Sequence, residues 1–203
     1  IIFIGDYRMS KRAEQTGSNK KWWISFLLLA ALLLFFEGMF LIYGPGVYND
    51  SEQYLQMHIH REPLYPLFLW VLRLCTSEHY LILMGIVQNF FMAVSIWLLT
   101  RSIARKFSFS AGWQLLLVLI QVFPHLMTKY FSVMGVFITN SVMSEALTFP
   151  LFTLWIMNTL EFLWEGKRKN AVGMLVFSFL LSLTRSQMMV TILIFFFAEL
   201  YRL

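Results

Sequence analysis

The sequence predicts an all-α, polytopic membrane protein with about six transmembrane helices and surface-lying helices in its first outer loop. Its composition is the first reason: hydrophobic residues make up 59% of the 203 residues, and charged residues only 13%. Soluble domains average about 45–50% apolar and about 25% charged residues, so this chain has too few charges to cover a water-facing surface. The second reason is a series of apolar runs, most of them near the ~20 residues that a helix needs to cross the hydrocarbon core.

The first apolar run, Trp22–Tyr43, follows Lys20 and Lys21 and a polar segment. It is longer than the ~7–15-residue apolar core of a signal peptide, and it lacks a small-residue cleavage site. We therefore predict a retained first span, preceded by a cytoplasmic amino-terminal tail over residues 1–21.

The segment from about residue 44 to 77 is less apolar than the runs on either side and contains Pro, Gly and several charges. Within it, Leu67–Leu74 is amphipathic. We expect this segment to be the first outer loop, with short helices lying at the membrane surface rather than a further span.

Five more spans complete a predicted transmembrane domain over residues 22–203. The last of them stops almost at Leu203, so we expect the chain to be the amino-terminal part of a longer protein. The five runs are His79–Thr100, Ala111–Met127, Ala146–Trp164, Ala171–Thr184 and Met188–Tyr201.

The basic residues predict the orientation. With a cytoplasmic amino terminus, twelve of the sixteen Lys and Arg residues lie inside, and Arg61, Arg73, Lys129 and Arg185 lie outside. This asymmetry follows the positive-inside rule. The net charge of +5 is therefore mainly a topology signal, and we expect membrane lipid, not nucleic acid, to be the partner of the basic clusters.

The same topology places acids and bases from four chain segments on the outer face. A site for an anionic, membrane-held substrate needs such a set, because a phosphate is bound by Arg or Lys and a reacting hydroxyl needs a carboxylate. The outer-face residues are Asp50, Glu52, His58, His60, Arg61, Glu62, His125, Lys129, Ser144, Glu145 and Arg185.

Each acid of this set, and Arg185, can also have a purely structural role. Asp50 precedes a short helix and is suited to cap it, and Glu52 can be either a second ligand or the solvated first turn of that helix. Glu145 with Ser144 can cap the fourth span, although an acid at that depth is costly and tends to be paired or functional. Arg185 can extend to the interface without binding a phosphate.

Several kinds of chemistry are disfavoured by the sequence. It has no glycine-rich phosphate loop, no Cys/His zinc spacing and no nucleophile elbow. His58 and His60 point to different faces of a helix, so we do not expect a metal pair there. Cys75 is the single cysteine and cannot form an internal disulfide.

Four short motifs in succession resemble the amino-terminal half of the GT-C membrane glycosyltransferases. This superfamily includes the protein O-mannosyltransferases and the aminoarabinose transferases of lipid A. The resemblance covers roughly residues 44–187 and depends on the order of the motifs together with their consistent topology. The motifs are Asn49-Asp50-Ser51 with Tyr54, Arg61–Leu69, Ser144-Glu145 and Leu183-Thr184-Arg185.

The resemblance implies an inverting glycosyltransferase that uses a polyprenyl-phosphate sugar as donor. The acceptor would be a glycan, lipid or protein on the extracytoplasmic face of the cell membrane. Asp50 would then be the general base toward the acceptor hydroxyl or would help to hold a divalent metal. Arg61, Arg185 and Lys129 would stabilise the phosphate, and Glu145 would orient the acceptor, bind metal or position Arg185. The remaining expected substrate contacts are Glu52, Tyr54 and His60.

Two other functions remain open from the sequence. One is a transporter or flippase of lipid-linked glycans, and the other is a non-catalytic subunit of a glycan polymerase or ligase complex. Transporters usually hold their ionisable groups near the bilayer midplane between repeated halves. Here these groups lie near one predicted face and no repeat is evident, which favours the enzyme.

Overall fold

The computed structural model describes residues 2–48, 50–58, 60–132 and 135–202, with side chains from Trp23 onward. All regular elements in these ranges are helical, which confirms the predicted all-α fold. Apart from them, the described residues contain one isolated β-bridge, between Gly46 and Ser141. The elements are α1 (Ile2–Tyr43), α2 (Ser51–Leu55), α3 (Leu64–Cys75), α4 (Tyr80–Phe107), α5 (Ala111–Phe131), η1 (Ile138–Asn140), α6 (Glu145–Glu165), α7 (Arg168–Thr184), η2 (Ser186–Met189) and α8 (Val190–Arg202).

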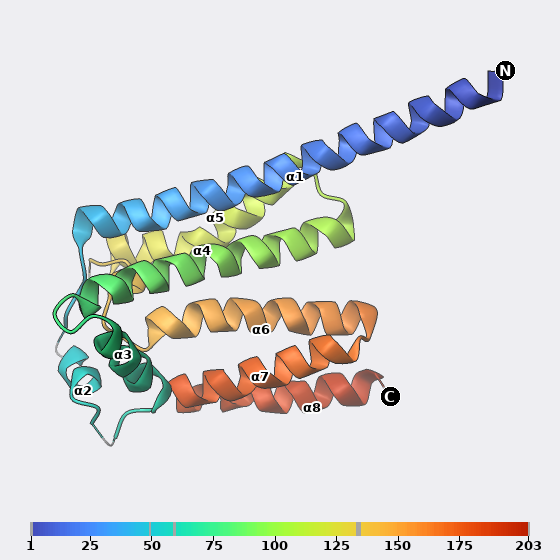
Figure 1. The fold of residues 1–203 in the computed structure, drawn as a ribbon. Coiled ribbons are helices and arrows are strands. Elements are labelled where there is room, and N and C mark those ends of the chain that lie inside the picture. Colours follow the sequence, from blue (N-terminus) through green and yellow to red (C-terminus); the bar gives the residue numbers. More distant parts are fainter. Residues whose placement is uncertain (1, 49, 59, 133–134, 203) are drawn as a thin grey trace.

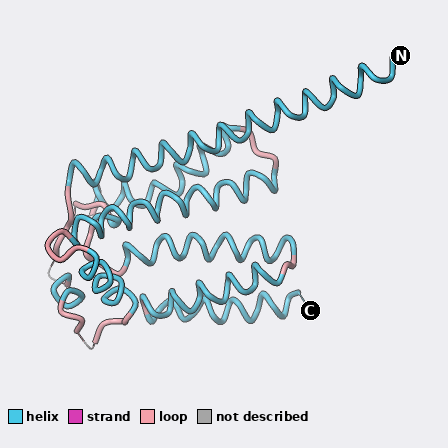
Figure 2. The backbone as a smooth tube through the Cα atoms, in the orientation of Figure 1, coloured by secondary structure: helices cyan, strands magenta, loops and turns pink. Residues whose placement is uncertain are grey.

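The long helices α1, α4, α5, α6, α7 and α8 run side by side in alternating directions (Figure 1). Their connections therefore collect at two opposite ends of the bundle (Figure 2). One end, here named the α3 end, holds α2, α3 and the connecting residues 135–144 and 185–189. The other, here named the Gly166 end, holds the α4–α5 and α6–α7 connections and the end of α8. A series of spans that cross a membrane one after another predicts this alternation in helix direction.

The number of spans differs from the prediction. In the described part of the chain, four helices are long and apolar enough to cross a membrane: Trp23–Tyr43, Tyr80–Phe107, Ala111–Phe131 and Glu145–Glu165. The fifth and sixth predicted spans correspond to α7 and α8, which have 17 and 13 residues. At ~1.5 Å per residue both are shorter than a hydrocarbon core of ~30 Å. The polar sequence around Arg185 interrupts the helix and shortens both elements.

Helix boundaries agree with the prediction at some ends and not at others. The first span ends at Tyr43 as predicted, whereas α1 also continues through the segment expected to be a tail. α4 runs seven residues past Thr100 and ends where Ser108 adopts a left-handed conformation. The loop predicted over 44–77 contains two short helices, and α3 begins three residues before the expected Leu67. Asn49, part of the first predicted motif, lies outside the described residues.

Helix α4 is central, because it contacts α1, α5 and α6. Its two halves belong to different apolar clusters. Met92 and Ile96 pack with α1 and α5 in one cluster. Met84 packs with side chains from α2, α3, α6, α7 and α8 in the other. The bundle therefore consists of two groups of helices joined through α4 and α6.

The contact of α1 with α4 depends on a glycine. The ring of Phe40 lies over Gly85 so closely that a Cβ on Gly85 would stand 2.1 Å from the Phe40 ring. Phe40 is only 4% exposed, so the ring has little space in which to move. Gly85 is therefore required by the close approach of α1 and α4.

We expect Gly85→Ala to destabilise the protein, because the new methyl group overlaps the buried Phe40 ring. The expected loss is about 1–3 kcal/mol, measured as a lower Tm of the purified protein in detergent. Gly38→Ala in α1 is the matched control, because its added Cβ has no atom within 4 Å apart from its chain neighbours and the adjacent backbone of its own helix. Equal Tm values for the two variants would contradict the proposed contact.

Candidate functional site

Tyr54 of α2 is the centre of a polar network at the α3 end. Its side chain is 5% exposed, and its hydroxyl donates a hydrogen bond of 3.1 Å to Ser144 Oγ at the start of α6. The guanidinium of Arg61 lies over the Tyr54 ring, 4.8 Å from its centroid. Tyr54 thus connects the first loop to a segment ninety residues later in the chain.

Asp50 is paired with Arg61. The distance from Asp50 Oδ1 to Arg61 Nη2 is 3.2 Å, and the Asp50 side chain is 59% exposed. Asp50 occupies the position before α2, but its carboxylate makes no capping hydrogen bond to the described backbone of that helix. The ion pair, rather than the cap, is therefore the main contact of this acid, and its exposed face remains open to a ligand.

Glu145 forms an ion pair with Arg185, so the first residue of α6 is tied to the residue that follows α7. The second oxygen of Glu145 accepts a hydrogen bond of 3.4 Å from Ser144 Oγ. The hydroxyl of Ser144 makes no capping hydrogen bond to the described backbone of α6. Of the roles considered for Glu145, the positioning of Arg185 has direct geometric support.

These contacts form one continuous chain of polar groups. Arg61 Nη1 donates to the Tyr54 hydroxyl at 3.4 Å, the Tyr54 hydroxyl donates to Ser144, and Ser144 donates to Glu145. With the two ion pairs, the chain extends from Asp50 to Arg185. Five of the eight predicted site residues are connected in this way.

Glu62 belongs to the same region, although the sequence did not single it out as a site residue. Its Oε1 accepts a hydrogen bond of 3.0 Å from the backbone N–H of Ser186. Partial burial tends to raise the pKa of Glu62, but this hydrogen bond and the nearby charge of Arg185 outweigh it, so the pKa lies below its ordinary value. The position of Glu62 next to Arg61 in the second motif was the available signal.

The buried side chain of Tyr65 supports the network through its contacts with α4 and with Tyr54. The Tyr65 hydroxyl accepts a hydrogen bond of 2.9 Å from Gln88 of α4 and donates one of 3.3 Å to the carbonyl of Ser141. The ring of Tyr65 meets that of Tyr54 edge to face, with centroids 5.2 Å apart. Burial raises the pKa of Tyr65, so its hydroxyl remains a donor. These contacts hold Tyr65 in place, and Tyr65 in turn holds the Tyr54 ring in position.

Three predicted residues lie outside the network. Glu52 is exposed and accepts a hydrogen bond from Gln56 within the same loop. His60 is exposed, with its ring 5.2 Å from that of His58. Lys129 Nζ lies 3.6 Å from the centroid of the Tyr43 ring and donates to the carbonyl of Gly135 at 2.7 Å.

Two cavities border different parts of the molecule. One of about 40 Å³ lies beside Tyr54, between α2 and α3, and is also lined by Arg73. A larger one, of about 550 Å³, lies at the Gly166 end and includes none of the network residues. No group of three or more His, Cys, Asp or Glu side chains that could hold a metal ion is found in the described residues.

Comparisons of the chain with protein-family models, with curated proteins and with solved structures give no match.

We expect Glu145→Gln and Arg185→Gln each to lower the Tm, because each leaves a partly buried charge without its partner. Removal of both should cost less than the sum, with a coupling of about 1 kcal/mol in a double-mutant cycle. The exposed pair Lys167–Glu165 is the control, and its coupling should be near zero. Additive effects at Glu145 and Arg185 would show that the ion pair contributes nothing.

The lowered pKa of Glu62 predicts a pH-dependent contribution to stability. Because the folded pKa lies below the unfolded one, the contribution is complete above the ordinary Glu value of ~4.3 and is lost as the pH falls through the folded value. The Tm of the wild type should exceed that of Glu62→Gln at neutral pH, and this difference should shrink as the pH falls below ~4. A difference independent of pH would contradict this assignment.

Proposed function

We propose that this chain belongs to an integral membrane glycosyltransferase of the GT-C type. It would transfer a sugar from a polyprenyl-phosphate donor to an acceptor on the extracytoplasmic face. The observation that carries the proposal is the network at the α3 end. There, Asp50 and Arg61 of the first loop meet Glu145 of α6 and Arg185 after α7 through Tyr54 and Ser144.

In this proposal Asp50 acts as the general base. Its carboxylate is paired with Arg61 through one oxygen, and its side chain is 59% exposed, so an acceptor hydroxyl can approach it. Asp50 takes the proton of that hydroxyl while the acceptor oxygen forms a bond to the anomeric carbon of the sugar. Attack from the face opposite the phosphate inverts the configuration at this carbon.

The departing group is a lipid phosphate. As the bond from the anomeric carbon to the phosphate oxygen breaks, the electron pair stays on the phosphate, and a guanidinium stabilises the developing charge. Arg61 and Arg185 supply this charge in the proposal, and Glu145 fixes the direction of Arg185. A divalent metal, if the reaction uses one, would supply further positive charge at the phosphate.

The location of the network favours an enzyme over a transporter. Its residues lie just before α2 and within it, in the loop after α2, at the start of α6 and just after α7, so they gather at an end of the bundle and not at its middle. If the α3 end faces the extracytoplasmic side, as the basic residues predict, the network lies at the depth of a lipid phosphate.

A non-catalytic subunit is the second candidate. The observation in its favour is that each carboxylate of the network already has a cationic partner, Asp50 with Arg61 and Glu145 with Arg185. Such pairs can serve structure alone, in which case neutral substitutions would change stability and not turnover.

The test is transfer by the reconstituted full chain, in vesicles that contain a polyprenyl-phosphate sugar and an acceptor. Asp50→Asn should reduce turnover by about 10²–10⁴-fold, the usual contribution of a general base, with little change in Tm. Glu78→Gln is the matched control, because Glu78 is an exposed acid near the α3 end outside the network. Unchanged turnover in Asp50→Asn would remove Asp50 from the mechanism, and no transfer by the wild type would favour the subunit.

A further inference from the structure

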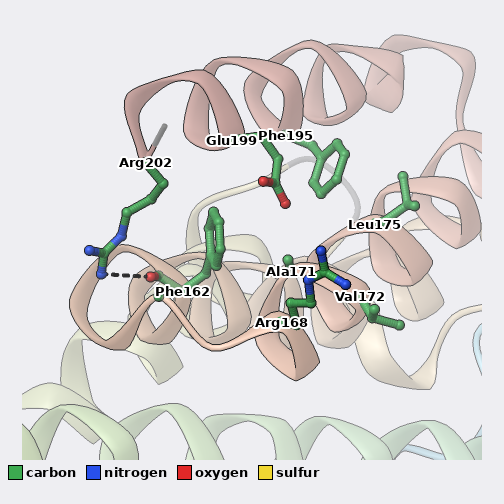
Figure 3. Close-up of a pocket in the computed structure, with 9 residues that line it drawn as sticks. Phe162, Arg168, Ala171, Val172, Leu175, Phe195, Glu199 and Arg202 are labelled. Carbon is green, nitrogen blue, oxygen red and sulfur yellow. Dashed lines mark hydrogen bonds between the residues drawn. The ribbon is translucent and has the colours of Figure 1, made fainter.

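The cavity at the Gly166 end lies between α7 and α8, next to the carboxyl end of α6 (Figure 3). Its volume is about 550 Å³, within the ~300–1,000 Å³ range that is typical of small-molecule sites. The proposed transfer reaction does not use it, since the reacting groups lie at the opposite end of the bundle.

Two guanidinium groups and one carboxylate line this cavity. Arg168 begins α7, and Glu199 and Arg202 lie one turn apart on α8. In Figure 3 the carboxylate of Glu199 points from α8 toward the side of the cavity formed by Arg168. None of the ion pairs between described residues involves Glu199 or Arg168, so both retain binding capacity.

Arg202 is fixed in place by the backbone. Its Nη2 donates to the carbonyl of Phe162 at 3.1 Å and to that of Leu163 at 2.6 Å. These bonds hold the guanidinium at the end of α6, and its other nitrogen atoms make no hydrogen bond to the described residues. The cation is therefore pre-positioned at the edge of the cavity, where little side-chain entropy remains to be lost on binding.

The rest of the wall is apolar. Val172 and Leu175 of α7 and Phe195 of α8 continue from the charged residues along the helices, and Val172 and Leu175 are exposed. The charged residues lie at the helix ends, beside the basic Lys167 and Lys169. A ligand with a charged head and an aliphatic tail matches this order of polar and apolar groups.

Charge complementarity selects among membrane lipids. A phosphodiester is the natural partner of two guanidinium groups, but an anionic lipid without an amine would meet the carboxylate of Glu199 unfavourably. The quaternary ammonium of phosphatidylcholine carries no N–H to donate to that carboxylate. The primary ammonium of phosphatidylethanolamine carries three.

We propose that this cavity binds phosphatidylethanolamine from the bilayer. The phosphate contacts Arg168 and Arg202, the ammonium group contacts Glu199, and an acyl chain lies along Val172, Leu175 and Phe195. The inference does not depend on the proposed transferase activity, because the two sites lie at opposite ends of the bundle.

The test is lipid retention by the purified full chain, measured by native mass spectrometry. Phosphatidylethanolamine, phosphatidylcholine and phosphatidylglycerol with identical acyl chains are offered separately in detergent. The wild type should retain phosphatidylethanolamine about tenfold better than the other two, as expected for one charged hydrogen bond. Equal retention of the three lipids would overturn the proposal.

Variants assign the preference to the cavity. Glu199→Gln should abolish the preference for phosphatidylethanolamine, while Glu78→Gln at the other end should keep it. Leu175→Trp, which fills the cavity from an exposed position, should lower retention of phosphatidylethanolamine without lowering the Tm in lipid-free detergent. An unchanged preference in folded Glu199→Gln protein, or unchanged retention of phosphatidylethanolamine in folded Leu175→Trp protein, would show that the lipid binds elsewhere.

Discussion

The ion pair between Glu145 and Arg185 is the interaction on which the α3 end depends. Glu145 begins a membrane-length helix, where an unpaired carboxylate would be costly, and Arg185 lies at the break between α7 and α8. Their pairing holds α6 and α7 in register at this end. Ser144, which donates to Glu145 and accepts from Tyr54, transmits that register to the first loop. Arg61 donates to the Tyr54 hydroxyl and, through its ion pair, holds Asp50 in position.

Much of the fold could be predicted because hydropathy and helix length are local properties. The end of the first span at Tyr43 and the start of α5 at Ala111 agree with the structure. The end of α4 does not, because Arg101, Arg105 and Lys106 end the apolar run but not the helix, which stops only at Ser108. The number of spans differs from the prediction for a related reason: an apolar run shows that a segment avoids water, whereas the length of its helix shows whether it can cross a bilayer.

The site could be predicted only in part, because partner choice depends on distances between remote segments. Residue types and topology were sufficient to group Asp50, Arg61, Glu145 and Arg185 at one end. They were not sufficient to show that Asp50 pairs with Arg61 and does not cap α2, since both interactions satisfy a carboxylate equally well in local terms. Lys129 was expected with these residues, but the ring of Tyr43 and the carbonyl of Gly135 hold it apart from the network.

The division into two apolar clusters has a consequence for biogenesis. The helices of one cluster, α1, α4 and α5, are all synthesised before α6 begins. A nascent chain can therefore bury Phe36 against its neighbours before α6, α7 and α8 of the second cluster have been synthesised. The later helices then dock through α6, where the ring centroids of Phe149 and His125 are 5.5 Å apart. Membrane insertion would thus pass through a three-helix intermediate in which one side of α4 stays exposed to lipid.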